Sequence, residues 1–185
     1  TYVLWDQSTG SSGGLTSAVT TGTTTAYSVD SETASITVSD VNDAQVIASA
    51  TNFTGITEDD NQAATPSDFA QISALVTVTD VDNSAPNDGI AIVAQSATNG
   101  VWKYSTDGST WGTVSLGSGA LVLDLDDFLA FVPDGANGGT STLEFHAWDQ
   151  YSDTTAPTPG TNATVDGTGG PEAFSAATDT LSIVV

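Results

Sequence analysis

A pattern of residues near the start of the sequence is repeated near its end. Trp5-Asp6-Gln7 opens one segment and Trp148-Asp149-Gln150 opens the other, and each segment closes on an alternating run that contains Ile36 or Ile183. The two copies are 143 residues apart at the tryptophan and 147 apart at the isoleucine, so four residues are inserted in the loop between. A period of this size is that of a whole domain. The chain is therefore expected to hold a partial repeat, residues 1–41, and a complete repeat, residues 42–185.

Short runs rich in Val, Ile, Phe and Trp, separated by turn residues, predict β-strands and no long helix. Asp107-Gly108 lies between two arms that carry Trp102 and Trp111, which indicates a hairpin with these tryptophans as cross-strand partners. The expected fold is all-β, an antiparallel Greek-key β-sandwich with about seven strands per repeat. The strands are expected within residues 2–5, 34–38, 45–54, 74–79, 89–94, 100–111, 121–125, 130–133 and 142–148, with a further closing strand around Ile183.

The charge of the chain is strongly one-sided. Asp and Glu number 23, Lys and Arg together number 1, and the formal net charge is −22. Phosphate binding needs clustered cations, so nucleic acid is excluded as a partner and an anionic membrane surface is disfavoured. The sequence has no apolar run long enough for membrane insertion. Bound divalent cations or a salty medium would relieve the self-repulsion, and both indicate an extracellular location.

The sequence contains no cysteine, so an exported β domain of this kind would need a staple other than a disulfide, and calcium suits an acidic chain. No secretory signal is seen, which is expected of a mature or excised segment. Two Asn-x-Thr triplets, at Asn52 and Asn162, fit the N-glycosylation pattern, although chance matches are common in a chain rich in threonine.

Several motifs together carry a resemblance to a known family. Asp40-Val41-Asn42-Asp43 and Asp80-Val81-Asp82 resemble the linker and the Asp-x-Asp pair of cadherin-type domains. Trp102-Lys103-Tyr104-Ser105-Thr106-Asp107-Gly108, Phe131-Val132-Pro133-Asp134 and Phe145-His146-Ala147-Trp148-Asp149-Gln150 resemble the cadherin-like, immunoglobulin-like tandem repeats of giant bacterial surface adhesins. Two positions depart from that pattern: Ala44 replaces a ligand-bearing residue, and a basic residue is missing near Phe131 or His146.

The resemblance implies a calcium site at the junction of the two repeats. Linker ligands would come from Asp40, Asn42 and Asp43, the following domain would supply Asp80 and Asp82, and Glu58 would reach in from an acidic turn. The preceding domain's share would come from Asp6, Asp30 or Glu32. Two carboxylates at alternate positions of a strand end face the same side, which suits such a site. The alternative is that these residues only form solvated turns. A second acidic group, Asp124, Asp126 and Asp127, is interpreted as a solvated turn.

The aromatic residues leave two interpretations open. Trp5 and Trp148 occupy the same place in both copies, which favours a packing role. Trp102, Tyr104 and Trp111 would form a stacking platform in a carbohydrate-binding module, with glycans as partners. His146, the only histidine, is expected on the outer face of its strand.

We find no motif for catalysis. His146 has no nucleophile elbow near it, and cysteine chemistry is impossible. Paired carboxylates are too abundant to be informative. The sequence therefore predicts a non-enzymatic, calcium-stiffened extracellular repeat of a bacterial surface adhesin or fibre, whose partners are neighbouring copies of the same repeat. The main alternative is a subunit of a self-assembling filament, joined head to tail by donated strands, because residues 1–41 copy closing strands without opening ones.

Overall fold

The computed structural model describes residues 1–15, 20–61, 63, 65–82, 88–117, 119–151 and 156–185. The chain divides into two compact units, Thr1–Asp40 and Val41–Val185. Strands dominate the larger unit, and the one helix of the described residues is a single 3₁₀ turn at Ile72–Ala74. No helix in this part of the chain has the length and apolar character needed to cross a membrane.

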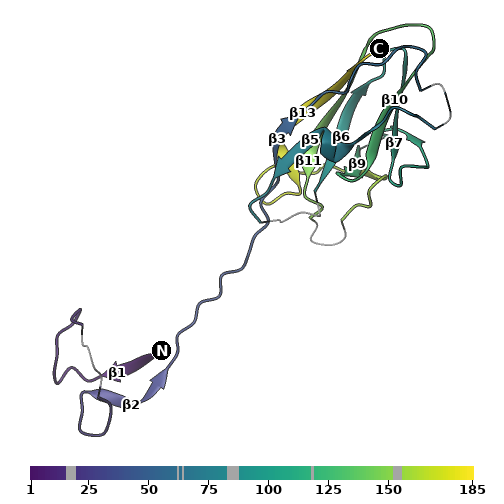
Figure 1. Cartoon of the computed structure of the whole chain (residues 1–185). Coiled ribbons are helices and arrows are strands. Elements are labelled where there is room, and N and C mark those ends of the chain that lie inside the picture. Colours follow the sequence, from purple (N-terminus) through teal and green to yellow (C-terminus); the bar gives the residue numbers. More distant parts are fainter. Residues whose placement is uncertain (16–19, 62, 64, 83–87, 118, 152–155) are drawn as a thin grey trace. The chain divides into compact units, whose positions relative to one another are not determined.

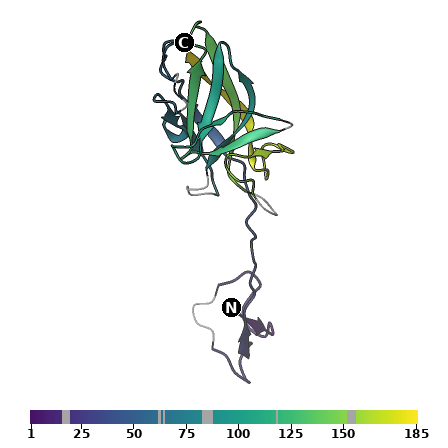
Figure 2. The same cartoon turned by 90° about the vertical axis from the view of Figure 1, so that its right-hand side faces the viewer.

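The larger unit is a β-sandwich, as expected (Figures 1 and 2). One sheet has five strands in the order β12-β9-β6-β11-β13, and the other has four in the order β4-β10-β7-β8, with neighbours antiparallel. A further pair, β3-β5, is also antiparallel. The strands are β3 (Val46–Ala50), β4 (Ala70–Gln71), β5 (Val76–Thr79), β6 (Gly89–Ser96), β7 (Gly100–Ser105), β8 (Gly112–Thr113), β9 (Ala120–Asp124), β10 (Phe128–Pro133), β11 (Thr140–Trp148), β12 (Asn162–Ala163) and β13 (Phe174–Val184).

Strict alternation along β11 builds two hydrophobic clusters, one on each face of the five-stranded sheet. Leu143 and Phe145 point between the sheets into the main core, which also holds Trp102 and Phe131 in edge-to-face contact at 5.0 Å between ring centroids. Trp148 lies on the other face in a smaller cluster with Ala91, Ala120, Val122 and Phe174, and it is fully buried. Side chains of a strand alternate between faces, so one strand serves both clusters.

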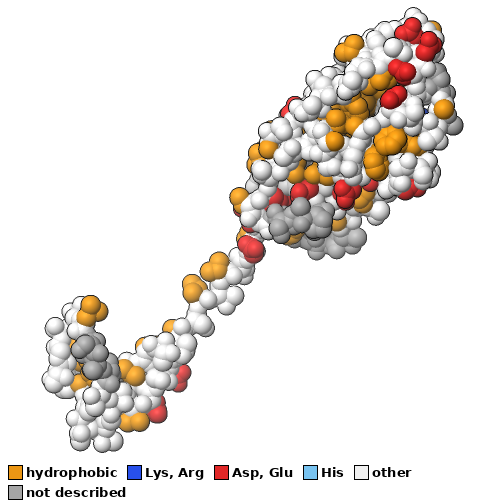
Figure 3. Space-filling model, viewed as in Figure 1, with side chains coloured by type: hydrophobic (Ala, Val, Ile, Leu, Met, Phe, Trp, Pro, Cys, Tyr) orange, Lys and Arg blue, Asp and Glu red, His pale blue; other side chains and the backbone are white. Residues whose placement is uncertain are grey.

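The chain enters the sandwich beside β13. The amide of Ala44 donates to Gly170 O at 2.6 Å, that of Phe53 to Ser182 O at 3.0 Å and that of Ile56 to Val184 O at 3.0 Å. The rising residue numbers on both sides show that this segment runs parallel to β13. A groove of about 440 Å³ lies along this segment, and its lining includes apolar residues such as Phe53 and Leu75 and polar residues such as Asn52 and Asp68. Figure 3 shows apolar side chains gathered in the middle of this face of the sandwich.

The smaller unit is a hairpin of β1 (Tyr2–Trp5) and β2 (Tyr27–Glu32). The prediction of a half-buried closing strand at residues 34–38 is wrong for this unit. These residues form no strand, and Ile36 and Val38 are 89% and 85% exposed. Their counterparts at the end of β13 pair with β11, and Ile183 is buried against the opposite sheet. Residues 34–38 carry the same alternation as the end of β13, but the described residues of the smaller unit form no opposite sheet that could bury it.

The predicted hairpin around Asp107-Gly108 is present, but its tryptophans are not cross-strand partners. β7 pairs with β8 through Lys103↔Thr113 and Tyr104↔Gly112, and residues 106–111 form the loop between the two strands. Trp102 pairs with Phe131 of β10 instead, and Trp111 lies outside the strands against Phe69, 5.5 Å between ring centroids. Carboxylate capping explains the wider loop, because Asp107 Oδ1 accepts from the amides of Ser109 and Thr110.

Candidate metal centre at the linker end of the sandwich

Strand ends bring a group of carboxylates together where the linker enters the sandwich. Gly89, the first residue of β6, pairs with Asp124 at the end of β9 and with Trp148 at the end of β11. Asp88 and Asp149 are the next residues along the chain, so they lie at this same end. Thr79, which precedes Asp80, pairs with Val46 at the start of β3. Figure 3 shows Asp and Glu side chains near this end.

The linker residue Asn42 contacts one of these carboxylates directly. Its Nδ2 donates to Asp149 Oδ2 at 2.8 Å and also approaches Glu172 O at 3.3 Å. The other oxygen of Asp149, Oδ1, accepts from the amide of Tyr151 at 2.7 Å. A single linker side chain is thus held against the end of β11 and the start of β13, because Asp149 N also donates to Ala173 O.

The next linker residue is tied to the Asp-x-Asp pair. Asp82 Oδ2 accepts from the amide of Asp43 at 2.6 Å, and Asp80 Oδ1 accepts from the amide of Asp82 at 2.9 Å. The sequence predicts that Asn42, Asp43, Asp80 and Asp82 lie together, and in the structure they do. The contact between Asp43 and Asp82 is made by the main-chain amide of Asp43, and the Asp43 carboxylate takes no part in it.

A buried glutamine completes the group. Gln45 is 1% exposed, and its Nε2 donates to Asp88 Oδ1 while its Oε1 is buried without a hydrogen-bond partner. Gln150 Nε2 donates to Asp124 Oδ2 at 3.2 Å. Gln150 has φ of +59°, an uncommon backbone conformation for a residue with a side chain. Two amide side chains thus lie among carboxylates that have no Lys or Arg to neutralise them. The single Lys or Arg of the chain, Lys103, lies in the four-stranded sheet, where its Nζ donates to Thr113 Oγ1.

Electrostatics at this end favour protonation. Burial raises the pKa of Asp88, and the carboxylates of Asp80 and Asp124 raise it further. Burial also raises the pKa of Asp149, and Asp80 adds to the effect, although the hydrogen bond from Asn42 opposes it. Like charges in a partly buried site disfavour ionisation, and a divalent cation reverses that balance.

The residues present fit calcium by ligand type. Carboxylate oxygens, an amide oxygen at Gln45 and main-chain carbonyls make an all-oxygen donor set, which is what this hard cation takes. The buried Gln45 Oε1 is an acceptor with no donor, which costs free energy unless something positive binds it. Within the described residues, however, no three acidic or histidine side chains stand in an arrangement that would hold a metal ion. Binding would therefore need side-chain rotation.

One predicted ligand is not brought to this group. Glu58 lies two residues after Ile56, whose amide bonds to Val184 at the far end of β13, whereas Asp149 bonds to Ala173 beside its start. The eleven residues of β13 span roughly 35 Å, so Glu58 is at the opposite end of the sandwich and its assignment is corrected. Asp40 belongs to the smaller unit and is exposed, as are Asp6, Asp30 and Glu32.

The structure adds four residues that sequence reasoning did not assign: Gln45, Asp88, Asp124 and Asp149. The repeated Trp-Asp-Gln motif contains Asp149 in one copy and Asp6 in the other, and this repetition is a sequence signal for Asp149. For Asp124 the sequence predicts a solvated turn. That description suits Asp126, which is exposed, but Asp127 is only 5% exposed and its carboxylate accepts from the amide of Asp124 at 2.8 Å.

The proposed carbohydrate platform is not formed. Trp102 is 1% exposed and its Nε1 donates to Ser96 O inside the sandwich. Tyr104 is half-buried with its hydroxyl on Gly160 O. Trp148 is buried as the packing role requires, and His146 is half-buried with Nδ1 2.7 Å from Ser175 O.

The two glycosylation candidates differ in their contacts. The Asn162 amide nitrogen donates to both Ser115 O and Leu116 O, so a glycan there would break a contact of β12. Asn52 is exposed and uses its Oδ1, which accepts from the amide of Ser182. Asn52 is therefore the more accessible acceptor.

Comparison of the chain with models of protein families, with curated proteins and with solved structures finds no match.

Proposed function

We propose that this chain is a non-enzymatic, extracellular structural repeat, a piece of a bacterial surface adhesin or fibre in which calcium stiffens the linker. One observation carries the proposal: the linker residues Asn42 and Asp43 are tied to Asp149 and Asp82 at an end of the sandwich that is rich in carboxylates and lacks cations. A cation bound there would join the linker to the strand ends, and it would lower the mobility of the joint under tension.

This arrangement supports a calcium site better than it supports a solvated acidic turn. Solvated turns keep their carboxylates in water, whereas burial raises the pKa of both Asp88 and Asp149. A net charge of −22 adds a general repulsion that an extracellular divalent cation would reduce. The candidate ligands are Asn42, Asp43, Gln45, Asp80, Asp82, Asp88, Asp124 and Asp149.

The test is thermal unfolding of the full chain in calcium and in EGTA. For an extracellular site with a dissociation constant near 10⁻⁴ M, millimolar calcium adds about 1.4 kcal/mol, which raises the Tm by several degrees. The double substitution Asp80→Asn and Asp82→Asn should remove this increase, because asparagine keeps the shape of the side chain and loses its charge.

A matched control is Glu58→Gln with Asp59→Asn, which removes the same charge at the opposite end of the sandwich. Its calcium response should equal that of the unaltered chain. Equal loss of the response in both double variants would show that calcium acts only by screening. A chain whose Tm is the same in calcium and in EGTA would exclude the metal-stiffened linker.

A further inference from the structure

The small hairpin is a residue-by-residue copy of the end of the complete repeat. Trp5↔Tyr27, Val3↔Ser31 and Tyr2↔Glu32 pair in β1-β2, and the residues in the same positions of β11-β13 pair in the same register with the same irregularity before the tryptophan. Four hydrogen bonds of the hairpin also recur in the complete repeat. In the hairpin they run from Asp6 N to Ala26 O, Gly22 N to Tyr27 O, Leu4 N to Ser28 Oγ and Ser8 N to Asp6 Oδ1. Their counterparts, in the same order, run from Asp149 N to Ala173 O, Gly169 N to Phe174 O, Ala147 N to Ser175 Oγ and Tyr151 N to Asp149 Oδ1.

Burial is reversed between the two copies. Tyr2, Leu4 and Ile36 are 50%, 71% and 89% exposed, whereas their counterparts Phe145, Ala147 and Ile183 are at most 3% exposed. In the complete repeat Phe145 and Ile183 belong to the main core between the sheets, and Ala147 lies on the same face of β11 as Phe145. An isolated two-stranded hairpin is marginally stable in water, and the exposed Tyr2 and Leu4 of β1 lack the opposite sheet that covers their counterparts.

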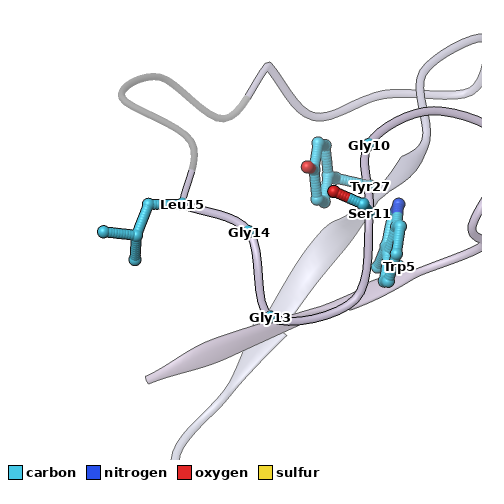
Figure 4. Close-up of a pocket in the computed structure, with 7 residues that line it drawn as sticks. All are labelled: Trp5, Gly10, Ser11, Gly13, Gly14, Leu15 and Tyr27. Carbon is cyan, nitrogen blue, oxygen red and sulfur yellow. The ribbon is translucent and has the colours of Figure 1, made fainter.

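The outer face of the hairpin is only partly covered. Figure 4 shows Trp5 and Tyr27 beside the loop that carries Gly10 and Ser11. Trp5 Nε1 donates to Thr9 O at 2.7 Å, and the ring lies 3.6 Å from the position that a Cβ would have on Gly10. This loop gives Trp5 some of the cover that Trp148 receives from Ala91 and Val122 of β6 and β9.

We infer that the hairpin is the closing half of a second sandwich, and that its inner face and its β1 edge dock the opening strands of a repeat of this same kind. The occupant is a polypeptide segment homologous to residues 42–143. This inference rests on the repeat architecture within the proposed function and is independent of calcium.

The complete repeat specifies the occupant's chemistry. β11 pairs with β6, so β1 takes an antiparallel strand whose inner face is apolar, like Ile90 and Ile92. Opposite Trp5 that strand carries glycine. In the complete repeat a Cβ on Gly89 would lie 2.8 Å from the Trp148 ring and 2.5 Å from Leu123 O, which leaves no room for a side chain.

The chain's own strands are a poor substitute for that occupant. Leu4 stands where the fully buried Ala147 fits, and Ala34 stands where the fully buried Leu181 fits. Overpacking at one position and a cavity at the other both destabilise a core. Exchange of hairpins between two copies of this chain is therefore disfavoured, and the docked strands belong to a different repeat.

The test places an additional copy of residues 42–143 directly before Thr1, so that Leu143 precedes Thr1 as it precedes Glu144 in the complete repeat. Hydrogen exchange of the β1 and β2 amides is measured in EGTA for the chain with and without this addition. The expected result is slower exchange in the fused chain, and exchange slower by about a hundredfold or more once Leu4→Ala with Ala34→Leu restores the residues of the complete repeat. Gly89→Val in the added copy alone should abolish the slowing.

A second variant guards against misfit of the added strands. Leu4→Ala with Ala34→Leu restores the residues of the complete repeat, so its fusion should form the second sandwich even if the native fusion does not. Slowing in either fusion supports the inference, and fast exchange in both overturns it. Slow exchange in the unfused chain, together with a dimer in size-exclusion chromatography, would make a second copy the occupant and would also overturn it.

Discussion

At the scale of single residues, the acidic chain places one carboxylate where water reaches it poorly. Burial, together with the charges of Asp124 and Asp126, raises the pKa of Asp127 to about 6, although the hydrogen bond that its carboxylate accepts from the amide of Asp124 opposes the rise. The unfolded carboxyl titrates near 3.9. Between these two values the folded state holds a proton that the unfolded state does not. Binding of this proton by Asp127 stabilises the folded state. This contribution to the free energy of unfolding is fully present below about pH 4 and is lost as pH rises through about 6.

Asp127→Asn is expected to raise the free energy of unfolding at pH 7.5 by about 1 to 2 kcal/mol and to change it little at pH 4.5. The substituted side chain retains an oxygen that can accept from the amide of Asp124, and it carries no charge to desolvate. Urea unfolding in EGTA at the two pH values measures the effect.

The exposed neighbour provides the control, since Asp126→Asn removes the same charge without removing a buried one. Equal stabilisation by both variants at pH 7.5 would assign the gain to general charge reduction. A less stable Asp127→Asn chain would show that the carboxylate is needed in its ionised form.

At the scale of elements, β6 is the central strand of the five-stranded sheet. It pairs with β9 on one side and β11 on the other, and its side chains serve both hydrophobic clusters. Gly89 is set between a backbone carbonyl of β9 and the ring of Trp148, so its lack of a side chain allows these strands to approach. Gly89 is therefore a position of β6 at which even one added methyl group is expected to be costly.

Gly89→Ala is expected to destabilise the sandwich by about 2 kcal/mol, because the added methyl would meet Leu123 O, which the sheet holds in place. Ala94→Ser on the exposed part of the same strand is the comparison and should change the Tm by a degree or two at most. Thermal unfolding followed by near-ultraviolet circular dichroism reads the packing of Trp148. Equal stability of the two variants would contradict the tight approach of the strands.

At the scale of the whole molecule, the two units differ in how much core each one has. The unit Val41–Val185 buries two hydrophobic clusters within itself, and the unit Thr1–Asp40 exposes the corresponding residues. Stability is therefore concentrated in the larger unit, and the smaller one is expected to open at low free energy.

A chain shortened to residues 41–185 should unfold in EGTA with a Tm within about two degrees of the full chain, because its core is complete. Differential scanning calorimetry of both chains measures this. A substantially lower Tm for the shortened chain would show that the hairpin contributes to the stability of the sandwich, contrary to this expectation.

The sequence by itself determined the β-sandwich class and the position of most strands of the larger unit, because alternation and turn residues act locally. It also placed Asn42, Asp43, Asp80 and Asp82 together through the motif they resemble. The tertiary structure decided what local patterns do not encode. In the tertiary structure Glu58 lies at the far end of the sandwich, and Trp102 is buried. Strand pairing places Asp88, Asp124 and Asp149 at the end where Asn42 and Asp43 lie. Residues 34–38 show the difference most clearly: the same alternation is buried in β13 and exposed here, because burial depends on an opposite sheet that lies elsewhere in the sequence.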